Sequence, residues 1–210
     1  MQPFFIGITG GTGSGKTTFA NMIAQDFGRN VLIISQDMYY KDQRNQPLES
    51  RKKANMDCPD AVDFDLLIAH IKQLKKGKSI DSPLYNFTEH VREEKSITLE
   101  PHGVIVIEGL LVLSVKAMRD LLDLKIYVDV DSDLRVSRRI LRDVKEGREP
   151  DLEGSIEQYL LSAYPMHKRY VEPQRNYADL IIPWNVMEKE SVETVVARIK
   201  SELDERNIKS

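Results

Sequence analysis

A glycine-rich segment near the N-terminus has the residue types and spacing that bind nucleoside triphosphates. Residues 10–17 read GGTGSGKT, which matches the pattern Gly-x-x-x-x-Gly-Lys-Ser/Thr without deviation. Glycines let backbone N–H groups turn toward phosphate oxygens, Lys16 can reach the β- and γ-phosphates, and the Thr17 hydroxyl can bind Mg²⁺. The segment follows an apolar strand-like run and precedes a helical pattern, as this chemistry requires. The residues predicted to bind the nucleotide here are Gly10, Gly11, Thr12, Gly13, Ser14, Gly15, Lys16, Thr17 and Thr18.

This segment alone does not separate kinases, GTPases and motor ATPases. A guanine-specific GTPase is expected to carry an Asn-Lys-x-Asp segment that reads the base, and the sequence contains none. The Asp-x-x-Gly string at Asp151–Gly154 follows a predicted helix instead of a strand, so we interpret it as a chance match. Motor-type ATPases need more chain than the remaining residues provide. A small-molecule kinase is the class that the sequence favours.

Two acidic residues follow predicted strands and could support phosphoryl transfer. Asp37 closely follows the apolar run 31–35, and Glu108 ends the run 104–107. Parallel strands end at the edge of the sheet where α/β ligands bind, beside the phosphate-binding segment. There Asp37 could take the proton of an attacking hydroxyl, and Glu108 could support the metal ion. The alternative for Asp37 is a turn or helix-capping aspartate.

A set of arginines at helical spacing could supply positive charge. Arg135, Arg138, Arg139 and Arg142 recur at i, i+3, i+4 and i+7 of a helix that begins near residue 132. Several arginines on one face favour the binding of phosphate or hydroxyl groups, with at least one of them serving structure alone. The alternative is a solvated face whose charge is offset by nearby acids. The opposite side of this helix carries Val136, Ile140, Leu141 and Val144.

The elements that must position these residues are predicted from apolar runs. Five β-rich runs are bounded by turn residues: 4–8, 31–35, 104–107, 125–130 and 179–182. Near-continuous apolar strands are typical of a parallel sheet buried on both faces, and helical segments alternate with these runs. We therefore predict an α/β fold of the P-loop NTPase type, a doubly wound parallel sheet of about five strands with helices on both faces. The last helix carries its apolar residues on one side: Val192, Val195, Val196, Ile199 and Leu203.

Residues 79–100 break the alternation of strands and helices. They contain two short strand-like pieces around a polar centre, which predicts an inserted β-hairpin. Residues 143–155, at the end of the arginine-bearing helix, are predicted to form a lid. Because there is no internal repeat, low-complexity tract or linker, we predict that residues 1–210 form a single kinase domain.

Composition excludes several classes of protein. Hydrophobic residues make up 41% and charged residues 30% of the chain, which is typical of a globular protein and not of a disordered one. With a net charge of −3, neither nucleic acid nor a membrane is expected as a partner. The single cysteine, Cys58, suits a reducing compartment, and the N-terminus resembles a strand more than a signal peptide. These features predict a cytoplasmic protein.

Taken together, the residues resemble the uridine kinase (uridine-cytidine kinase) family, within the phosphoribulokinase/uridine kinase group. The resemblance covers nearly the whole chain, and several of its segments are specific to that family. They are ISQDMYYKD, NMDCPDAVDFDLL, SPLYNFTEHVR, VIVIEGLLVL, DLKIYVDVDSDLRVSRRILRD and YVEPQRNYADLIIP. The resemblance implies phosphorylation of the 5′-hydroxyl of uridine and cytidine with Mg²⁺ and ATP or GTP, in pyrimidine salvage. It also implies a homo-oligomer, commonly a tetramer.

The resemblance further implies roles for individual residues. Asp37 corresponds to the catalytic base, beside Lys16, and the magnesium site falls on Thr17, Asp37 and Glu108. Arg142 corresponds to a phosphate-contacting lid arginine. The acceptor site falls on Asp57, Arg139 and Gln158 for the ribose, on Tyr40, Tyr85, Phe87 and His90 for the pyrimidine, and on Arg148 in the lid. Aromatic walls suit a flat base, although Tyr-x-Phe alone would more often be core packing.

Two segments depart from the family pattern. Residues 146–151 read EGREPD where Arg-Gly-Arg followed by a helix is usual, so one lid arginine is missing. Met56 and Cys58 flank Asp57, where an aromatic residue and a histidine are usual. Because both changes lie near the acceptor, they bear on the substrate more than on the reaction. Two alternatives stay open. One is a related kinase for another ribosyl compound, such as nicotinamide riboside, and the other is a catalytically inactive nucleotide-binding regulator.

Overall fold

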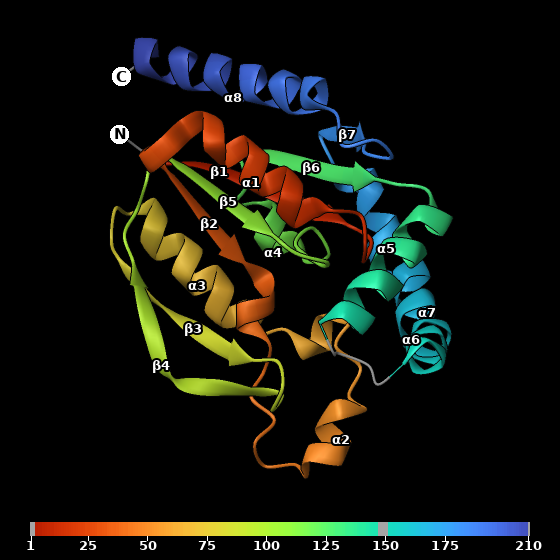
Figure 1. Cartoon of the computed structure of the whole chain (residues 1–210). Coiled ribbons are helices and arrows are strands. Elements are labelled where there is room, and N and C mark those ends of the chain that lie inside the picture. Colours follow the sequence, from red (N-terminus) through yellow and green to blue (C-terminus); the bar gives the residue numbers. More distant parts are fainter. Residues whose placement is uncertain (1–2, 147–150, 210) are drawn as a thin grey trace.

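The computed structural model of the chain describes residues 3–146 and 151–209. Its centre is a five-stranded parallel sheet in the order β2-β5-β1-β6-β7 (Figure 1). The strands are β1 (Phe4–Gly10), β2 (Val31–Ser35), β5 (Val104–Glu108), β6 (Leu124–Asp129) and β7 (Leu180–Pro183). All five predicted strands are confirmed, with bounds that differ by at most two residues. The predicted doubly wound parallel sheet is confirmed as well.

Helices cover both faces of this sheet. On one face, α1 (Lys16–Phe27) and α8 (Lys189–Lys209) lie side by side (Figure 1). On the other face lie α3 (Phe64–Lys75) and the short α4 (Lys116–Arg119). Side chains alternate along β1, so that Phe4 and Ile6 pack toward α1 and α8 while Phe5 packs toward α3. The apolar side predicted for the last helix is confirmed, because Val195 and Ile199 of α8 are fully buried.

One expectation about the strands is wrong. The run 31–35 was expected to be buried on both faces, yet Ile34 is its only fully buried residue within the described chain. The reason is topological, since β2 lies at the edge of the sheet and pairs only with β5 in the described structure. The neighbouring β5 lies inside the sheet and is buried along its whole length.

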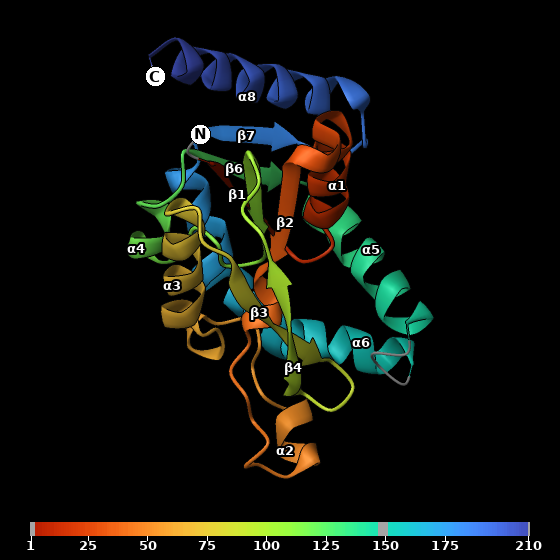
Figure 2. The same cartoon turned by 90° about the vertical axis from the view of Figure 1, so that its left-hand side faces the viewer.

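Residues 80–99 form the predicted hairpin. Strands β3 (Ile80–Asn86) and β4 (Val91–Leu99) pair antiparallel and make a separate two-stranded sheet. Figure 2 shows this hairpin apart from the main sheet, with α2 (Leu48–Lys52) beyond its tip. The segment between β2 and α3 also contains two 3-10 turns, η2 (Gln36–Tyr39) and η3 (Pro59–Ala61). The hairpin and this segment face each other where β2 ends.

The remaining helices follow β6. They are α5 (Ser132–Lys145), α6 (Leu152–Gln158) and α7 (Tyr164–Met166), with the π-helical stretches Tyr159–Ala163 and His167–Val171 on either side of α7 and a 3-10 turn at Glu172–Tyr177. The predicted lid, 143–155, includes residues 147–150, which lie outside the described residues. Across the described chain, none of the helices combines the length and apolarity that crossing a membrane requires.

The orientation of α5 excludes a fully solvated arginine face. Arg135 and Arg139 are buried, at 6% and 8% exposure, so the solvated-face alternative is wrong for these two residues. Part of the apolar side is turned outward, since Leu141 is 71% and Val144 is 47% exposed, while Val136 and Ile140 are partly buried. Arginine thus faces the interior of the fold, where the phosphate-binding loop and the acceptor residues lie.

Candidate active site

The phosphate-binding loop, residues 10–17, joins β1 to the first turn of α1. The N–H of Ser14 donates to the carbonyl of Gly11 at 3.0 Å, and the Nζ of Lys16 lies 3.5 Å from the same carbonyl. Gly13 has φ +73° and Gly15 has φ +80°, a left-handed conformation that favours glycine. A Cβ at Gly13 would also collide with the backbone oxygen of Arg135. Local sequence and close packing together therefore determine the shape of this loop.

Glu108 lies at the junction of three strands. In the interior strand β5, it pairs with Ile8 of β1 on one side and with Ser35 of β2 on the other. The Oγ1 of Thr17 donates a hydrogen bond to the Oε2 of Glu108 at 3.1 Å. Burial raises the pKa of Glu108, while the nearby ammonium of Lys16 lowers it. The sheet register thus brings a buried carboxylate to the first turn of α1.

Lys16 is buried among acidic groups. Burial lowers the pKa of its ammonium, whereas Glu108 and then Asp37 raise it. Two carboxylates therefore share this volume with one lysine, and a further cation would reduce the repulsion between them. Outside the gaps at 1–2, 147–150 and 210, no group of three His, Cys, Asp or Glu side chains could hold a metal by itself. Mg²⁺ at phosphoryl-transfer sites needs no such group, because waters and phosphates complete its shell. Thr17, Glu108 and Asp37 fit this ion.

Asp37 lies in the turn η2, immediately beyond the end of β2. The buried hydroxyl of Tyr40 is hydrogen-bonded to Asp37, and burial followed by the negative charge of Asp37 raises the pKa of Tyr40 well above its ordinary value. Tyr40 therefore stays protonated and orients the Asp37 carboxylate. Gln36 holds the same turn from the other side, since its Oε1 accepts the N–H of Leu111 at 2.9 Å.

Residues assigned to the ribose come together from three separate segments. Burial raises the pKa of Asp57, and among nearby charges Arg139 lowers it most. Arg139 of α5 donates to Gln158 at the end of α6 and to Asp143 at 3.2 Å. Arg142 donates twice to Asp143, at 2.8 and 3.0 Å, and its charge also acts on Asp57. The structure thus groups these side chains around Asp37 and Lys16. Arg148 lies outside the described residues.

Three of the four residues assigned to the pyrimidine form a row of aromatic rings. Tyr40 and Tyr85 have ring centroids 5.4 Å apart, and Tyr85 and Phe87 have centroids 5.2 Å apart. Tyr85 is buried, whereas Phe87 is 46% exposed. His90 lies in the turn of the hairpin with φ +51°. Burial, then Arg51 and Lys52 of α2, lower the pKa of His90. The structure therefore places His90 near the cations of α2.

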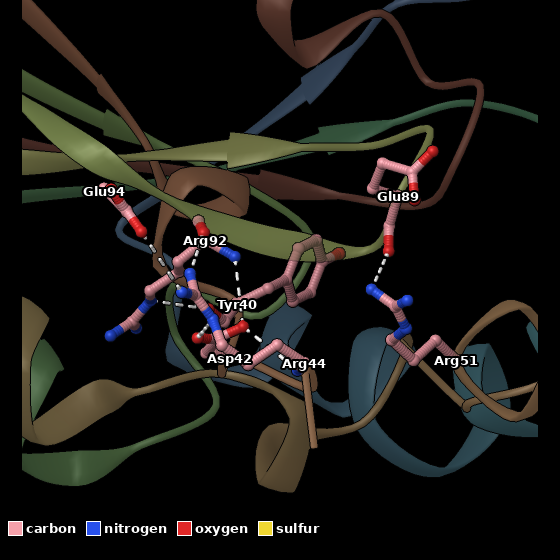
Figure 3. Close-up of polar contacts among 7 residues, drawn as sticks. All are labelled: Tyr40, Asp42, Arg44, Arg51, Glu89, Arg92 and Glu94. Atoms are coloured by element: carbon pink, nitrogen blue, oxygen red, sulfur yellow. Dashed lines mark hydrogen bonds and ion pairs between the residues drawn. The ribbon is translucent and has the colours of Figure 1, made fainter. Parts of the chain in front are cut away.

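Arginines attach the hairpin to the segment that follows β2 (Figure 3). The Nε of Arg92 donates to the carbonyl of Tyr40 at 2.8 Å, its Nη2 donates to that of Tyr39 at 3.1 Å, and its Nη1 lies 3.1 Å from a carboxylate oxygen of Asp63. Arg51 donates to the carbonyl of Glu89 at 2.6 Å. Arg92 thus ties the backbone of Tyr40, whose side chain orients Asp37, to the β4 strand. These arginines line an open groove of about 550 Å³ outside the acceptor residues.

Comparison with known proteins now decides the family. Residues 5–192 match the sequence profile of the Phosphoribulokinase / Uridine kinase family. The chain belongs to this family. It is 46% identical over 206 residues to a protein named uridine kinase from Clostridium novyi, covering 98% of this chain and 99% of that protein. It is 45% identical over 208 residues to another uridine kinase, from Geobacillus kaustophilus, covering 99% and 98%.

The fold is also that of solved members of the family. Phosphoribulokinase from Rhodobacter spheroides has a TM-score of 0.64 and 16% identity to this chain, covering 85% of this chain and 68% of that one. At this identity the likeness concerns the fold alone. The family assignment and the P-loop kinase fold inferred from the sequence are both confirmed.

Sequence reasoning missed two polar residues whose contacts shape the site. Gln174 is 1% exposed; its Oε1 accepts from Thr9 at 3.1 Å and from the N–H of Leu113 at 2.8 Å, and its Nε2 donates to Leu110 at 2.9 Å. It thereby holds the loop that follows Glu108. Arg92 was not assigned a role from the sequence either. In both cases a polar residue in polar sequence resembles a surface residue, and only the contacts reveal its role.

The two residues that depart from the family pattern flank Asp57. The Nε2 of Gln43 lies 3.5 Å from the Sδ of Met56, and the Sγ of Cys58 donates to the carbonyl of Asn55 at 3.4 Å. Both side chains are partly buried. Met56 thus lies beside Asp57 with a flexible thioether instead of an aromatic ring, so its contact with a base would be less directional.

Proposed function

We propose that this chain transfers the γ-phosphoryl group of ATP or GTP to the 5′-hydroxyl of uridine and cytidine, giving UMP and CMP in pyrimidine salvage. The observation that carries the proposal is near-full-length identity of about 45% to proteins named uridine kinase. The enzyme is accordingly a phosphotransferase with an alcohol group as acceptor. The grouping of Asp37, Asp57 and Arg139 around Lys16 supports the same conclusion.

In this reaction, Asp37 accepts the proton of the 5′-hydroxyl as that oxygen attacks phosphorus, and the Tyr40 hydroxyl orients its carboxylate. Lys16 and the backbone N–H groups of residues 10–17 hold the β- and γ-phosphates. Thr17 and Glu108, with Asp37, would hold Mg²⁺, which supplies charge neutralisation on the phosphate oxygens when bound. Asp57, Arg139 and Gln158 hold the ribose hydroxyls, and Arg142 faces the phosphates.

The pyrimidine ring packs against the aromatic row of Tyr40, Tyr85 and Phe87, and His90 contacts its polar edge. A neutral nucleoside suits such a wall, because its binding energy comes from stacking and a few directed polar contacts. We propose that residues 1–210 act as one kinase domain, with 79–100 forming part of the acceptor pocket and 143–155, including Arg148, serving as the lid.

The nearest alternative is a kinase of the same family that acts on another ribosyl compound, such as nicotinamide riboside. Its acceptor would share the ribose contacts and differ only in the base, so Met56 and the aromatic row would decide between them. An inactive regulator is not favoured. Lys16, Thr17, Asp37 and Glu108 are all in place, whereas a chain that had lost catalysis would be free to lose any of them.

The proposal is tested by acceptor-dependent ADP release with Mg²⁺ and ATP, offering uridine, cytidine, adenosine, nicotinamide riboside, ribulose 5-phosphate and UMP in parallel. Turnover confined to uridine and cytidine, with UMP and CMP identified by mass spectrometry, is the expected result. Turnover on nicotinamide riboside alone would support the nearest alternative. Binding of ATP without turnover on any acceptor would overturn the proposal. The same acceptors offered with GTP, with release of GDP measured instead of ADP, rank the two donors.

We also propose a cytoplasmic homo-oligomer, a tetramer by family resemblance. The single free thiol, Cys58, suits a reducing compartment. Support for assembly comes from large apolar side chains that are exposed along α5, α6 and the following π-helical stretch: Leu141, Leu152, Ile156, Leu160 and Leu161. Analytical ultracentrifugation measures the state directly, and a monomer at micromolar concentration would contradict this part of the proposal.

A further inference from the structure

Arg135 lies against the phosphate-binding loop and has no part in the proposed reaction. It belongs to the first turn of α5 and is 6% exposed. A Cβ at Gly11 would collide with the guanidinium of Arg135, and a Cβ at Gly13 would collide with its backbone oxygen. Two positions of the loop therefore rest directly on this one residue, the first on its side chain and the second on its main chain.

Neutral groups hold the guanidinium in place. Its Nε donates to the carbonyl of Val130 at 3.1 Å, and its Nη2 lies 3.3 Å from the Nε2 of His167. In the part of the chain that the structure describes, Arg135 forms no salt bridge, and its buried Nη1 has no hydrogen-bond partner. A buried positive charge that lacks a carboxylate is costly unless another anion compensates for it. The triphosphate bound by the adjoining loop is such an anion.

His167 can hold Arg135 only as a neutral imidazole. Arginine has no acceptor, so the Nε2 of His167 must accept the hydrogen bond and its proton must lie on Nδ1. Burial, followed by the charge of Arg135, lowers the pKa of His167 to about 4. At physiological pH the ring is therefore neutral and available as an acceptor.

We infer that Arg135 is a positioning residue for the phosphate-binding loop: held by His167, it supports Gly11 and Gly13 and supplies positive charge behind the triphosphate. This inference concerns nucleotide binding alone, so it does not depend on which acceptor the enzyme uses. It predicts that changes at Arg135 affect the nucleotide and leave the affinity for the nucleoside unchanged.

The pocket beside this pair offers a direct test. It has a volume of about 310 Å³ and is lined by Arg135 and His167 together with Tyr127, Ser132, Lys168 and Glu172. Truncation of Arg135 to alanine would leave a space connected to this pocket, into which free guanidinium could enter. If free guanidinium restores nucleotide binding, the missing group is identified as the guanidinium itself. A role of Arg135 in stability alone would not predict this restoration.

The experiment compares Arg135→Ala, Arg135→Met and Arg135→Lys by calorimetric binding of Mg-ATP in the absence of nucleoside. We expect Kd for ATP to rise by about tenfold or more in the Ala and Met variants, and less in the Lys variant, which keeps the charge. Millimolar guanidinium should lower Kd for Arg135→Ala only. The matched control is Arg119→Ala, which also removes an arginine held by neutral groups, in this case the carbonyls of Leu113 and Ser114.

Steady-state kinetics supply the second readout. KM for ATP should rise in the Arg135 variants, while KM for the nucleoside stays within about twofold of the wild-type value. Unchanged ATP affinity in a folded Arg135→Met protein would overturn the inference, as would an equal loss for both substrates. Because ATP binding is measured without an acceptor, failure of the proposed nucleoside specificity would leave this result interpretable.

Variants at His167 test the inference if the Arg135 variants do not fold. His167→Gln keeps a hydrogen-bond acceptor for Arg135, whereas His167→Leu removes it. We expect near-normal ATP affinity in the first and a Kd raised by about three- to tenfold in the second, at similar melting temperatures. Equal ATP affinities in the two folded variants would contradict the role given to His167.

Discussion

The loop that receives the nucleotide occupies eight consecutive residues, whereas the acceptor wall is assembled from segments that lie far apart in the chain. Gly13 and Gly15 shape the first through their own backbone conformation. The second depends on contacts such as those of Arg92, which join β4 to the backbone of Tyr39 and Tyr40. The comparison teaches that the backbone shape of the donor loop is encoded mainly by its own glycines, with support from Arg135, whereas the acceptor wall is encoded by packing alone. Apart from Arg135 and His167, changes outside the two sites should therefore affect the acceptor more readily than the donor.

The sharpest separation of the two regions is expected at Asp37, which lies between them. Asp37→Asn removes the proton acceptor and keeps the shape of the side chain. We expect kcat to fall by about 10²–10⁴-fold, because this is the range that general base catalysis contributes. Kd for ATP and for uridine should change little by calorimetry. Unchanged turnover would show that Asp37 is not the base. The reaction between the two regions would then have to depend on another group.

Substitution of one glycine tests how far the conformation of the phosphate-binding loop alone determines nucleotide binding. In Gly13→Ala, the new Cβ would meet the backbone oxygen of Arg135 at a residue whose φ is +73°. We expect Kd for ATP to rise by about 10–100-fold, which corresponds to the strain of a positive φ in a non-glycine residue. Gly28→Ala is the matched control, because it also alters a glycine with positive φ, at +56°, but with open space around its Cβ. Loss of uridine affinity together with ATP affinity would show that the two regions are not separable in this way.

Arg92 provides the corresponding test on the acceptor side. Arg92→Ala removes the donors that hold the carbonyls of Tyr39 and Tyr40 and the partner of Asp63. We expect KM for uridine to rise by about tenfold, with KM for ATP unchanged, since a few net hydrogen bonds to charged groups are lost. Arg44→Ala is the control, because Arg44 joins the same surface without reaching Tyr40 and is about half exposed. Equal effects of the two substitutions would argue against a specific role for Arg92.

The smallest effect is expected in the response of stability to pH. The pKa of His167 is about 4 in the folded chain, below the ordinary histidine value of 6.5 that applies to the unfolded chain. Burial lowers this pKa first and the charge of Arg135 second, while Glu172 opposes the shift. Below pH 6.5 the unfolded chain therefore binds a proton that the folded chain does not, and folding loses stability as the pH falls toward 4. Between about pH 7.5 and 5, urea unfolding of the wild type should lose about 1 kcal/mol more than that of His167→Gln, after a discount for partial solvation. A loss of equal size in both proteins would place the titration elsewhere.

The same contrast explains what the sequence could predict. The five strands, the phosphate-binding loop and the inserted hairpin follow from patterns within short stretches of residues, and all three are present in the structure. The burial of β2 was overestimated, because an edge strand and a central strand have the same apolar pattern.

The inward arginines of α5 were harder still to predict. Apolar residues such as Leu141 would ordinarily mark the buried side of a helix, yet here Arg135 and Arg139 are buried and Leu141 is exposed. The burial of Gln36, Gln174 and His167 was equally hard to predict, since a buried polar group is stabilised by its hydrogen-bond partners. Those partners come from distant parts of the chain, and periodicity carries no information about them.

The spacing of the arginines on α5 limits which insertions and deletions the chain can tolerate. Arg135 supports the phosphate-binding loop, and Arg139 and Arg142 reach the acceptor residues one and two turns later along the same rigid helix. Because the helix rises about 1.5 Å per residue, the number of residues between these arginines sets the distance between the donor and acceptor sites. One inserted residue between Arg135 and Arg139 would rotate the second by about 100° and carry it away from Asp57. The number of residues in this stretch is therefore constrained as strongly as their identity, so insertions should accumulate in the surface loops and be absent from this helix.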